Sequence, residues 1–266
     1  MTHARPDPVL RTKMLGVEVG ARALIHPVSM DVSAGQWLCV CGPNGAGKST
    51  LLRALAGLQP FKGAVELMAR PLELWPALER ATQLTWMGQA QPVPLDLTVS
   101  DVVQLGRWPH SRLNPQSASS DSPRVREAIA TMRLDDLARR GLDQISGGEC
   151  QRVLLARAMA AGTPVMLFDE PLNHLDMPHQ HAWLAWLRRH VASGAAVVTV
   201  MHELNQALGA DCLLVVREGR VLHQGPPEDL ATREALQEAF DQTLAFHAID
   251  TDGTGPRWVV LPRSVS

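Results

Sequence analysis

The sequence predicts an α/β fold that combines a buried parallel sheet with an antiparallel β subdomain and an inserted α-helical subdomain. Two uniform apolar runs, residues 165–169 and 196–201, are typical of strands buried on both faces of a parallel sheet. Residues 13–41 instead alternate apolar and polar positions in short runs broken by glycine and proline, which favours antiparallel strands. From about Thr98 onward the apolar residues follow a helical period.

The expected elements can be placed along the chain. The antiparallel strands end in the apolar run Trp37 to Cys41, and residues 63–69 and 82–87 are expected to form two further strands. A helix is expected behind a cap at Thr98 or Ser100. A later helical segment has its apolar positions at Val125, Ile129, Met132 and Leu137. The polar stretch between these helices, Ser111 to Pro123, has no periodicity and is expected to be a loop.

The whole chain, residues 1–266, is expected to form one domain, with its helical subdomain at about 90–160. A helix-like segment over residues 228–240 precedes a tail that alternates like a hairpin. This C-terminal hairpin extension is expected at about 244–262, with a turn near Asp252 and Gly253.

Composition limits the functional classes. The 266-residue chain has a net charge of −2 and a pI near 6.5, which gives no overall attraction to nucleic acid. Its longest uncharged apolar stretch, Gly194 to Met201, is too short to cross a bilayer, and the N-terminus has no apolar signal-peptide core. We therefore expect a soluble protein that remains in the cytoplasm. Cys39 and Cys41 alternate on one face of a strand, where buried apolar packing is the expected role.

The segment GPNGAGKST, Gly42 to Thr50, lies between the apolar run and a helix-like run, which is the setting of a phosphate-binding loop. Its glycines let the backbone turn tightly and point N–H groups at phosphate oxygens. Lys48 would reach the β- and γ-phosphates, and Ser49 would ligate Mg²⁺. The chain is thus expected to bind a nucleoside triphosphate through Gly42, Pro43, Asn44, Gly45, Ala46, Gly47, Lys48, Ser49 and Thr50.

Two further segments narrow the choice among phosphate-loop NTPases. Asp169 and Glu170 end an apolar strand, so one carboxylate can hold the Mg²⁺ shell and the next can polarise an attacking water. The segment ISGGE, Ile145 to Glu149, begins a helix, so that the Ser146 hydroxyl and the glycine N–H groups form a second phosphate-binding end. One chain needs only one such end for its own ATP. The second is explained if it reaches the γ-phosphate bound by a partner in a dimer.

These motifs, over nearly the whole chain and in this order, resemble those of the ATP-binding cassette (ABC) family. ISGGE resembles the family's signature, LSGGQ, and would supply Ser146, Gly147, Gly148 and Glu149. Asn173 to Asp176 resembles the D-loop, Gln89 resembles the Q-loop glutamine, and His202 resembles the switch histidine. The resemblance implies an α/β phosphate-loop NTPase core of the ABC ATPase type that hydrolyses ATP with Mg²⁺.

The resemblance also implies a role for each of these residues. Glu170 would be the catalytic base, and His202 would contact the γ-phosphate. Gln89 would contact Mg²⁺ and the attacking water, and Asp176 would help to couple the paired sites. The Mg²⁺ set would then be Ser49, Gln89 and Asp169.

Finer features resemble one branch of the family, the ATPases that drive bacterial uptake of cobalamin, haem and ferric siderophores. They are the segments at residues 105–110, 175–180, 202–208 and 225–230, together with the tail hairpin. The resemblance implies a homodimer on the cytoplasmic face of the bacterial inner membrane, docked on two transmembrane permease subunits that receive solute from a periplasmic binding protein. His174, His179 and His181 also suggest a metal site, but this stretch already matches the D-loop region.

Two departures from the family's pattern bear on the chemistry. The family usually stacks adenine on an aromatic residue ahead of the phosphate loop, but Leu15 to Leu24 contains none, so aliphatic packing from Val17 to Ala23 is expected instead. The signature ends in Glu149 rather than glutamine, which places a carboxylate near bound nucleotide unless it points outward.

Two other functional classes remain as alternatives. A soluble ABC protein that serves assembly, translation or DNA repair would usually carry a second cassette, a long coiled coil or a basic surface, and the sequence has none of these. A nucleotide kinase or GTPase would leave ISGGE unexplained, and the sequence has no N-K-x-D guanine-reading segment. The importer ATPase is the leading interpretation.

Overall fold

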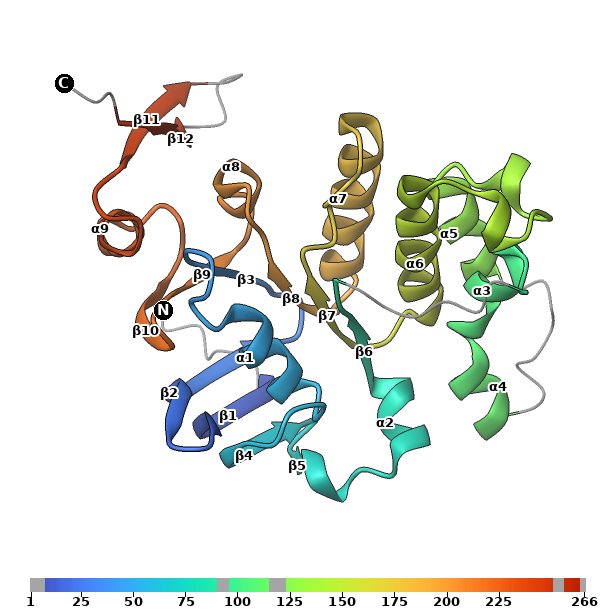
Figure 1. Ribbon diagram of the computed structural model, residues 1–266, viewed down its shortest axis with the longest axis horizontal. Helices are drawn as coiled ribbons and strands as arrows, with labels where there is room; N and C mark the ends of the chain where they lie inside the picture. The colour runs from blue at the N-terminus through green and yellow to red at the C-terminus, as the bar shows by residue number, and fades with distance from the viewer. Residues whose placement is uncertain (1–7, 90–95, 115–122, 251–255, 264–266) are drawn as a thin grey trace. The chain divides into compact units, whose positions relative to one another are not determined.

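The computed structural model describes residues 8–89, 96–114, 123–250 and 256–263. It divides into two compact units (Figure 1). Unit 1 comprises Met1–Leu72 and Ala196–Ser266, and unit 2 comprises Glu73–Ala195.

Unit 1 contains the predicted antiparallel sheet. Its four strands run in the order β2-β1-β4-β5, and they are β1 (Pro8–Val19), β2 (Arg22–Ser33), β4 (Lys62–Leu67) and β5 (Arg70–Pro71). The strand expected over residues 63–69 ends two residues early because Met68 and Ala69 adopt left-handed φ values of 50° and 58°. These two residues form the turn into β5.

A second sheet of unit 1 carries the strand ahead of the phosphate loop. Its order within the unit is β10-β9-β3-β8, formed by β3 (Trp37–Cys41), β8 (Ala196–Val200), β9 (Cys212–Arg217) and β10 (Arg220–Gly225). β3 is parallel to both β8 and β9. For β8, the uniform apolar run at residues 196–201 had predicted a strand in a parallel sheet. Trp37 joins the strands, because its ring N–H donates to the Thr199 hydroxyl at 2.9 Å and its backbone N–H to Asp211 at 2.7 Å.

The helices of unit 1 are α1 (Lys48–Leu55), α8 (Leu204–Ala207) and α9 (Leu230–Ala239). α1 contacts β1 and β2, and α9 contacts β9 and β10 (Figure 1). The chain then forms β11 (Leu244–Asp250) and β12 (Pro256–Pro262), which pair antiparallel as the tail pattern predicted. The turn expected near Asp252 and Gly253 lies outside the described residues.

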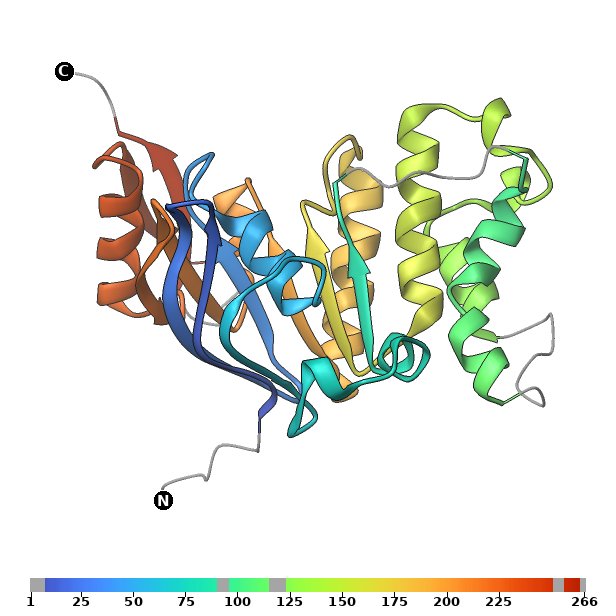
Figure 2. The ribbon, with the colours of Figure 1, turned by 60° about the horizontal axis from the view of Figure 1, so that its bottom comes forward.

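Unit 2 is mostly helical. Two parallel strands, β6 (Leu84–Met87) and β7 (Val165–Asp169), pair with each other. The helices are α2 (Ala77–Gln83), α3 (Val99–Leu105), α4 (Trp108–Leu113), α5 (Pro123–Thr131), α6 (Gly147–Ala161) and α7 (Met177–Ala192). Short 3₁₀ turns lie at Asp135–Leu137 and Leu142–Gln144, and another, Leu72–Leu74, spans the chain boundary between units 1 and 2. α6 packs against α3 and α5, and α5 also contacts α7 (Figure 2).

The helical prediction for unit 2 holds in most details. Thr98 is the N-cap of α3, where its side chain forms a capping box with Asp101. The four predicted apolar positions, Val125, Ile129, Met132 and Leu137, are all buried. In the core of the unit, the rings of Phe168 and Trp183 meet edge to face with 5.2 Å between their centroids.

Two sequence expectations for unit 2 were wrong. The loop expected from Ser111 to Pro123 was wrong at both ends, because Ser111 to Leu113 complete α4 and Pro123 begins α5. Residues 115–122 lie outside the described residues, as does the expected start of the helical subdomain near residue 90. The strand expected over 82–87 begins at Leu84, because Thr82 and Gln83 end α2.

Among the described residues, no helix is both long enough and apolar enough to span a membrane.

We expect unit 2 to lose stability as the pH falls below the ordinary histidine pKa of about 6.5. Burial is the main cause that lowers the pKa of His110 and His190, and nearby Arg124 lowers both further. The folded chain therefore keeps both rings neutral at a pH where the unfolded chain protonates them, so the free energy of unfolding decreases as pH falls from about 6.5 towards the lowered values.

Urea unfolding between pH 7.5 and 5.5 checks this prediction. His190→Gln should unfold with a weaker pH dependence than the wild type, because one of the two groups no longer titrates. The substitution also removes the stacking of His190 on Trp186, whose ring centroids are 5.0 Å apart, so only the pH dependence is compared. Equal pH dependence in the two proteins would contradict the assignment.

Candidate functional site: a phosphate-binding loop, strand-end carboxylates and a capped signature helix

The phosphate loop leaves the buried strand β3 and enters α1. Gly42, Gly45 and Gly47 have φ values of 154°, 78° and 98°, in the region that favours glycine. A Cβ atom at Gly42 would lie 1.9 Å from the carbonyl oxygen of Val216, and one at Gly47 would lie 2.5 Å from Cδ1 of Ile25. At Gly45, by contrast, a Cβ would meet nothing within 4 Å, so this side of the loop is open.

Lys48 places a buried positive charge in the loop. Its side chain is 5% exposed, and its Nζ donates to the carbonyl oxygens of Gly42 at 2.7 Å and Pro43 at 2.9 Å. It is the first residue of α1, whose first turn contains no acidic residue. The ammonium group, the positive end of the helix and the open side at Gly45 together suit a polyphosphate.

The turn between β9 and β10 holds the phosphate loop through backbone hydrogen bonds. The Gly219 N–H donates to the Ala46 carbonyl at 2.9 Å, and the Gly219 carbonyl accepts from the His26 N–H at 2.8 Å. On the other side of the turn, Arg217 forms an ion pair with Asp241 at 2.8 Å. The loop is therefore held by backbone contacts from residues far away in the sequence.

His202 lies at the edge of the sheet where the phosphate loop also begins. β3 and β8 are parallel, with Val40 opposite Val200, so both strands end at one edge. The phosphate loop begins two residues after Val40, and His202 lies two residues after Val200 with its side chain exposed. Unit 1 therefore brings together the loop and the predicted switch histidine.

Unit 2 brings Gln89, Asp169 and Glu170 to one edge in the same way. β6 and β7 are parallel, with Met87 opposite Phe168, so the residues that follow them emerge side by side. Asp169 is 2% exposed, and Gln89 is exposed.

The backbone of Glu170 is unusual for this residue type. Its φ of 54° lies in the left-handed region, which costs a non-glycine residue about 1 kcal/mol or more. Its carboxylate oxygen Oε2 accepts from the Asn173 amide at 2.5 Å. Such conformations cluster at functional sites, although turn residues such as Met68 and Ala69 adopt them too.

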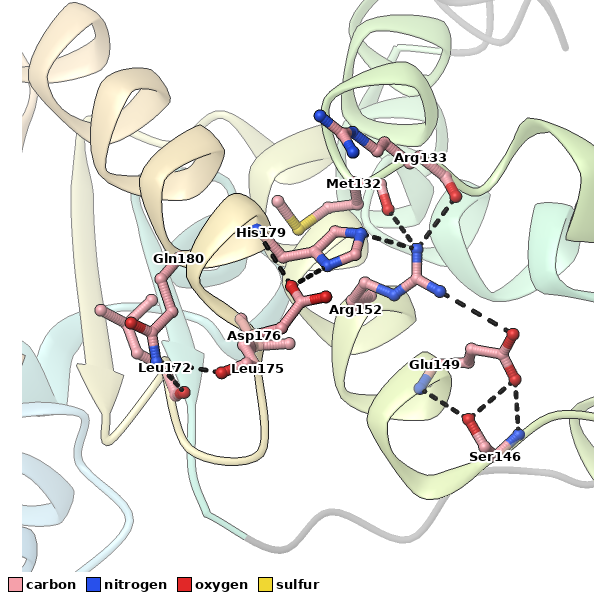
Figure 3. A network of polar contacts seen from close by, with 10 residues as sticks. All are labelled: Met132, Arg133, Ser146, Glu149, Arg152, Leu172, Leu175, Asp176, His179 and Gln180. Atoms are coloured by element: carbon pink, nitrogen blue, oxygen red, sulfur yellow. Dashed lines mark hydrogen bonds and ion pairs between the residues drawn. The ribbon is translucent and has the colours of Figure 1, made fainter.

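The signature segment forms the N-terminus of α6 (Figure 3). Ser146 is the N-cap, and its Oγ accepts from the Glu149 N–H at 3.3 Å. The Glu149 carboxylate returns to accept from the Ser146 N–H at 2.7 Å and from its hydroxyl at 2.8 Å. These hydrogen bonds, the backbone one first, lower the pKa of Glu149. The carboxylate thus points back to the cap that it completes, rather than outward as one sequence expectation allowed.

Arg152, one turn further along α6, connects the signature to the D-loop (Figure 3). Its guanidinium lies 3.8 Å from the Glu149 carboxylate and donates to the carbonyl oxygens of Met132 and Arg133 at 2.8 and 2.9 Å. It also lies 3.2 Å from Nε2 of His179 on α7. Because arginine can only donate, this His179 nitrogen is the acceptor.

Asp176 is the N-cap of α7, and its carboxylate accepts from the backbone N–H of His179 at 3.2 Å. It also accepts from Nδ1 of the same ring, and that side-chain hydrogen bond is the main cause that lowers the pKa of Asp176. Gln180 donates to the Leu175 carbonyl at 3.0 Å and so holds the loop that follows Glu170. His179 is therefore occupied within the D-loop region, where the sequence had also suggested a metal.

Two further sequence expectations, for the cysteines and for the segment near adenine, can be compared with the structure. Cys39 and Cys41 are fully buried with 3.8 Å between their sulfur atoms, as expected, and the side-chain hydrogen bond to Cys39 raises the pKa of Cys41. In the segment expected to pack against adenine, Val17 is fully buried, so its side chain packs in the core. Val19 is 58% exposed and offers the apolar surface.

Sequence reasoning missed three residues of this site. Asn173 was grouped with the D-loop but not assigned to Glu170, and Arg152 and the bonding role of His179 were not identified. The Glu149-x-x-Arg152 spacing, three residues apart on a helix, was the available signal for the ion pair. The contact between Arg152 on α6 and His179 on α7 joins two separate helices, so no residue spacing in the sequence indicates it.

The sequence profile of the ABC transporter family matches residues 25–173, more than half of the chain. The chain belongs to this family. The ABC ATPase is 40% identical to the hemin import ATP-binding protein HmuV of Gloeobacter violaceus over 248 residues, which cover 90% of each protein. It is 31% identical to the petrobactin import ATP-binding protein YclP of Bacillus subtilis over 250 residues, 93% of this chain and 98% of that protein.

Solved structures agree with this assignment. The chain resembles a metal-chelate type ABC transporter in an inward-facing conformation, with a TM-score of 0.78 and 26% identity over 97% of this chain and 98% of that chain. An ATP-binding subunit of an ABC transporter has the same TM-score at 24% identity, over 88% and 98%, which supports the fold. The ABC ATPase therefore hydrolyses ATP and binds it with Mg²⁺, as predicted.

Proposed function

We propose that this ABC ATPase powers the import of an iron complex, haem or a ferric siderophore, through a separate membrane permease. Supporting this are relatives named for hemin and petrobactin import that align over nine-tenths or more of both chains. Cobalamin, which the sequence resemblance also allowed, is less favoured because neither of these relatives is named for it. A periplasmic solute-binding protein would deliver the complex, and the ATPase would sit on the cytoplasmic face of the inner membrane.

We also propose that residues 1–266 make the single ABC ATPase domain expected from the sequence, and we assign its chemistry residue by residue. The loop from Gly42 to Thr50 would bind the phosphates, and Ser49, Gln89 and Asp169 would hold Mg²⁺. When bound, Mg²⁺ would neutralise charge that develops on the phosphates. Glu170 would then accept the proton of the attacking water, with its carboxylate oriented by Asn173 at 2.5 Å.

A homodimer would complete each site, because Ser146 caps the N-terminus of α6 and this helix end would bind an anion of the partner's nucleotide. His202 would contact the γ-phosphate in its own chain, while Ser146, Gly147 and Gly148 would approach it from the partner. Asp176 is joined to the signature through His179 and Arg152, and it would help to couple the two ATP sites of the dimer.

The permease would dock at the exposed apolar side chains of α3 and α4. Leu105, Trp108 and Leu113 are 41%, 52% and 49% exposed, and α4 packs on α2. Exposed apolar side chains on neighbouring helices would be covered if a partner docked there, so we assign the permease contact to these three residues.

One experiment tests the proposed function. In a bacterium that makes this protein, Glu170→Gln and Trp108→Asp should each stop uptake of labelled haem or ferric siderophore, and only Trp108→Asp should also prevent copurification of the permease. Glu73→Gln, an exposed change near α2, serves as the control. Loss of cobalamin uptake alone would identify cobalamin as the solute. A chain that copurifies with no membrane protein would indicate the soluble alternative, an assembly or repair factor.

The unusual Glu149 provides a further prediction. Glu149→Gln should lower the Michaelis constant for ATP several-fold, because a negative charge beside the incoming γ-phosphate is removed and the Ser146 hydroxyl is held less tightly. The glutamine carbonyl can still accept from the Ser146 N–H, so the helix cap is retained. Steady-state ATPase assays at low and high salt check this, and the difference should shrink at high salt. An unchanged constant at low salt would show that the carboxylate stays away from bound nucleotide.

A further inference from the structure

The C-terminal hairpin is attached to the helix that follows His202. The Asn205 side chain in α8 donates from Nδ2 to the Val260 carbonyl at 3.1 Å, and its Oδ1 accepts from the Val260 N–H at 2.7 Å. Val260 lies opposite Phe246 in the β11–β12 pair. Because both backbone groups of Val260 bind Asn205, they point away from β11, and the side-chain amide occupies the place of a further strand.

The hairpin is also anchored to α9. The Arg233 guanidinium lies 3.8 Å from the centroid of the Trp258 ring, and the Gln237 amide donates to the Leu244 carbonyl at 3.2 Å. The Val260 side chain is only 8% exposed. The hairpin is therefore attached to α9 and α8, while the far end of β11, residues 247–250, is exposed.

The position of α8 depends on such external support. The helix has only four residues, and one turn of helix has little stability of its own in water. It begins two residues after His202, at the edge of the sheet where the phosphate loop also begins. A tether at Asn205 thus restricts the segment that presents His202.

We propose that the hairpin β11–β12 is a positioning element for the nucleotide site, and that it acts through Asn205 to hold the His202 segment. Asn205 is in this view a positioning residue, three residues from the side chain that it places. The inference rests on the role proposed for His202. It assigns to the C-terminal extension a part in hydrolysis.

The first test is steady-state ATPase activity of the full chain. Asn205→Ala should lower kcat about tenfold and leave KM for ATP within about twofold, because misplacement affects the reacting geometry while the phosphate loop is unchanged. Gln237→Ala is the matched control. It also removes a side-chain amide bond to the hairpin backbone, but on the α9 side, and should leave kcat unchanged.

A double-mutant cycle tests whether Asn205 acts through His202. In a His202→Ala background, Asn205→Ala should cause no further loss of kcat, because the group that it positions is absent. Equal losses in both backgrounds would overturn the inference.

Amide hydrogen exchange tests the tether itself, independently of activity. Asn205→Ala should speed exchange at residues 203–207 and in β12 but not in α1. Unchanged exchange together with wild-type kcat would overturn the inference. If His202→Ala keeps the wild-type rate, the proposed role of His202 fails, and faster exchange would then support only the structural tether.

Discussion

Replacing Glu170 with glutamine is expected to lower ATP hydrolysis by about 10²-fold or more while the protein still binds MgATP. The substitution removes the proton acceptor but keeps the size of the side chain. Asn173, which donates to the carboxylate at 2.5 Å, can donate to the amide oxygen instead. The phosphate loop lies in unit 1 and is chemically unchanged, so binding should persist.

The same variant should trap the ATP-bound dimer. In sedimentation experiments, Glu170→Gln should be dimeric with MgATP and monomeric with ADP, since hydrolysis no longer releases the γ-phosphate that bridges the chains. Glu73→Gln is a useful control because Glu73 is exposed and lies outside the phosphate loop and the turn that supports it. A monomer under both conditions would contradict the ATP sandwich for the isolated chain.

Much of this site could be predicted from sequence because its motifs are local. The phosphate loop needs three glycines, a lysine and a serine within nine residues, and the flanking strand and helix have clear periodicity. Asp169 and Glu170 could be placed at a strand end because the apolar run stops there. Which of these strand ends lie side by side came from the structure, where β3 pairs with β8 and β6 pairs with β7.

The contacts that orient these side chains were less accessible. His179 and Arg152 meet because α6 and α7 pack together, and Asn205 meets Val260 across 55 residues. No period or spacing in the sequence reports such contacts. The left-handed backbone at Glu170 was hidden for a similar reason, since glutamate gives no local sign of a positive φ. The lengths of loops and short helices, such as α4, were also hard to predict, because tertiary packing overrides the weak helix preference of the local sequence.

The shared site makes a second large prediction, which requires two defective chains. Lys48→Ala removes the buried ammonium of the phosphate loop, and Ser146→Arg puts a bulky cation at the helix end that would face the partner's γ-phosphate. Each variant alone should lose about 10²-fold or more of its ATPase activity. Ser146→Arg also removes an N-cap, at a cost of about 1 kcal/mol, so its thermal unfolding is measured first to show that it is folded.

Mixing the two variants should restore activity. In a heterodimer both lesions fall in one site, where the altered loop of one chain faces the altered signature of the other, and the second site is intact. Random pairing makes half of the dimers heterodimers with one working site each, so about a quarter of the wild-type rate should return if the sites work independently. Differently tagged chains, copurified in MgATP, show that heterodimers form. Heterodimers that recover no activity would contradict the prediction. Their one intact site, which pairs Lys48 of one chain with Ser146 of the other, would then be unable to hydrolyse ATP by itself.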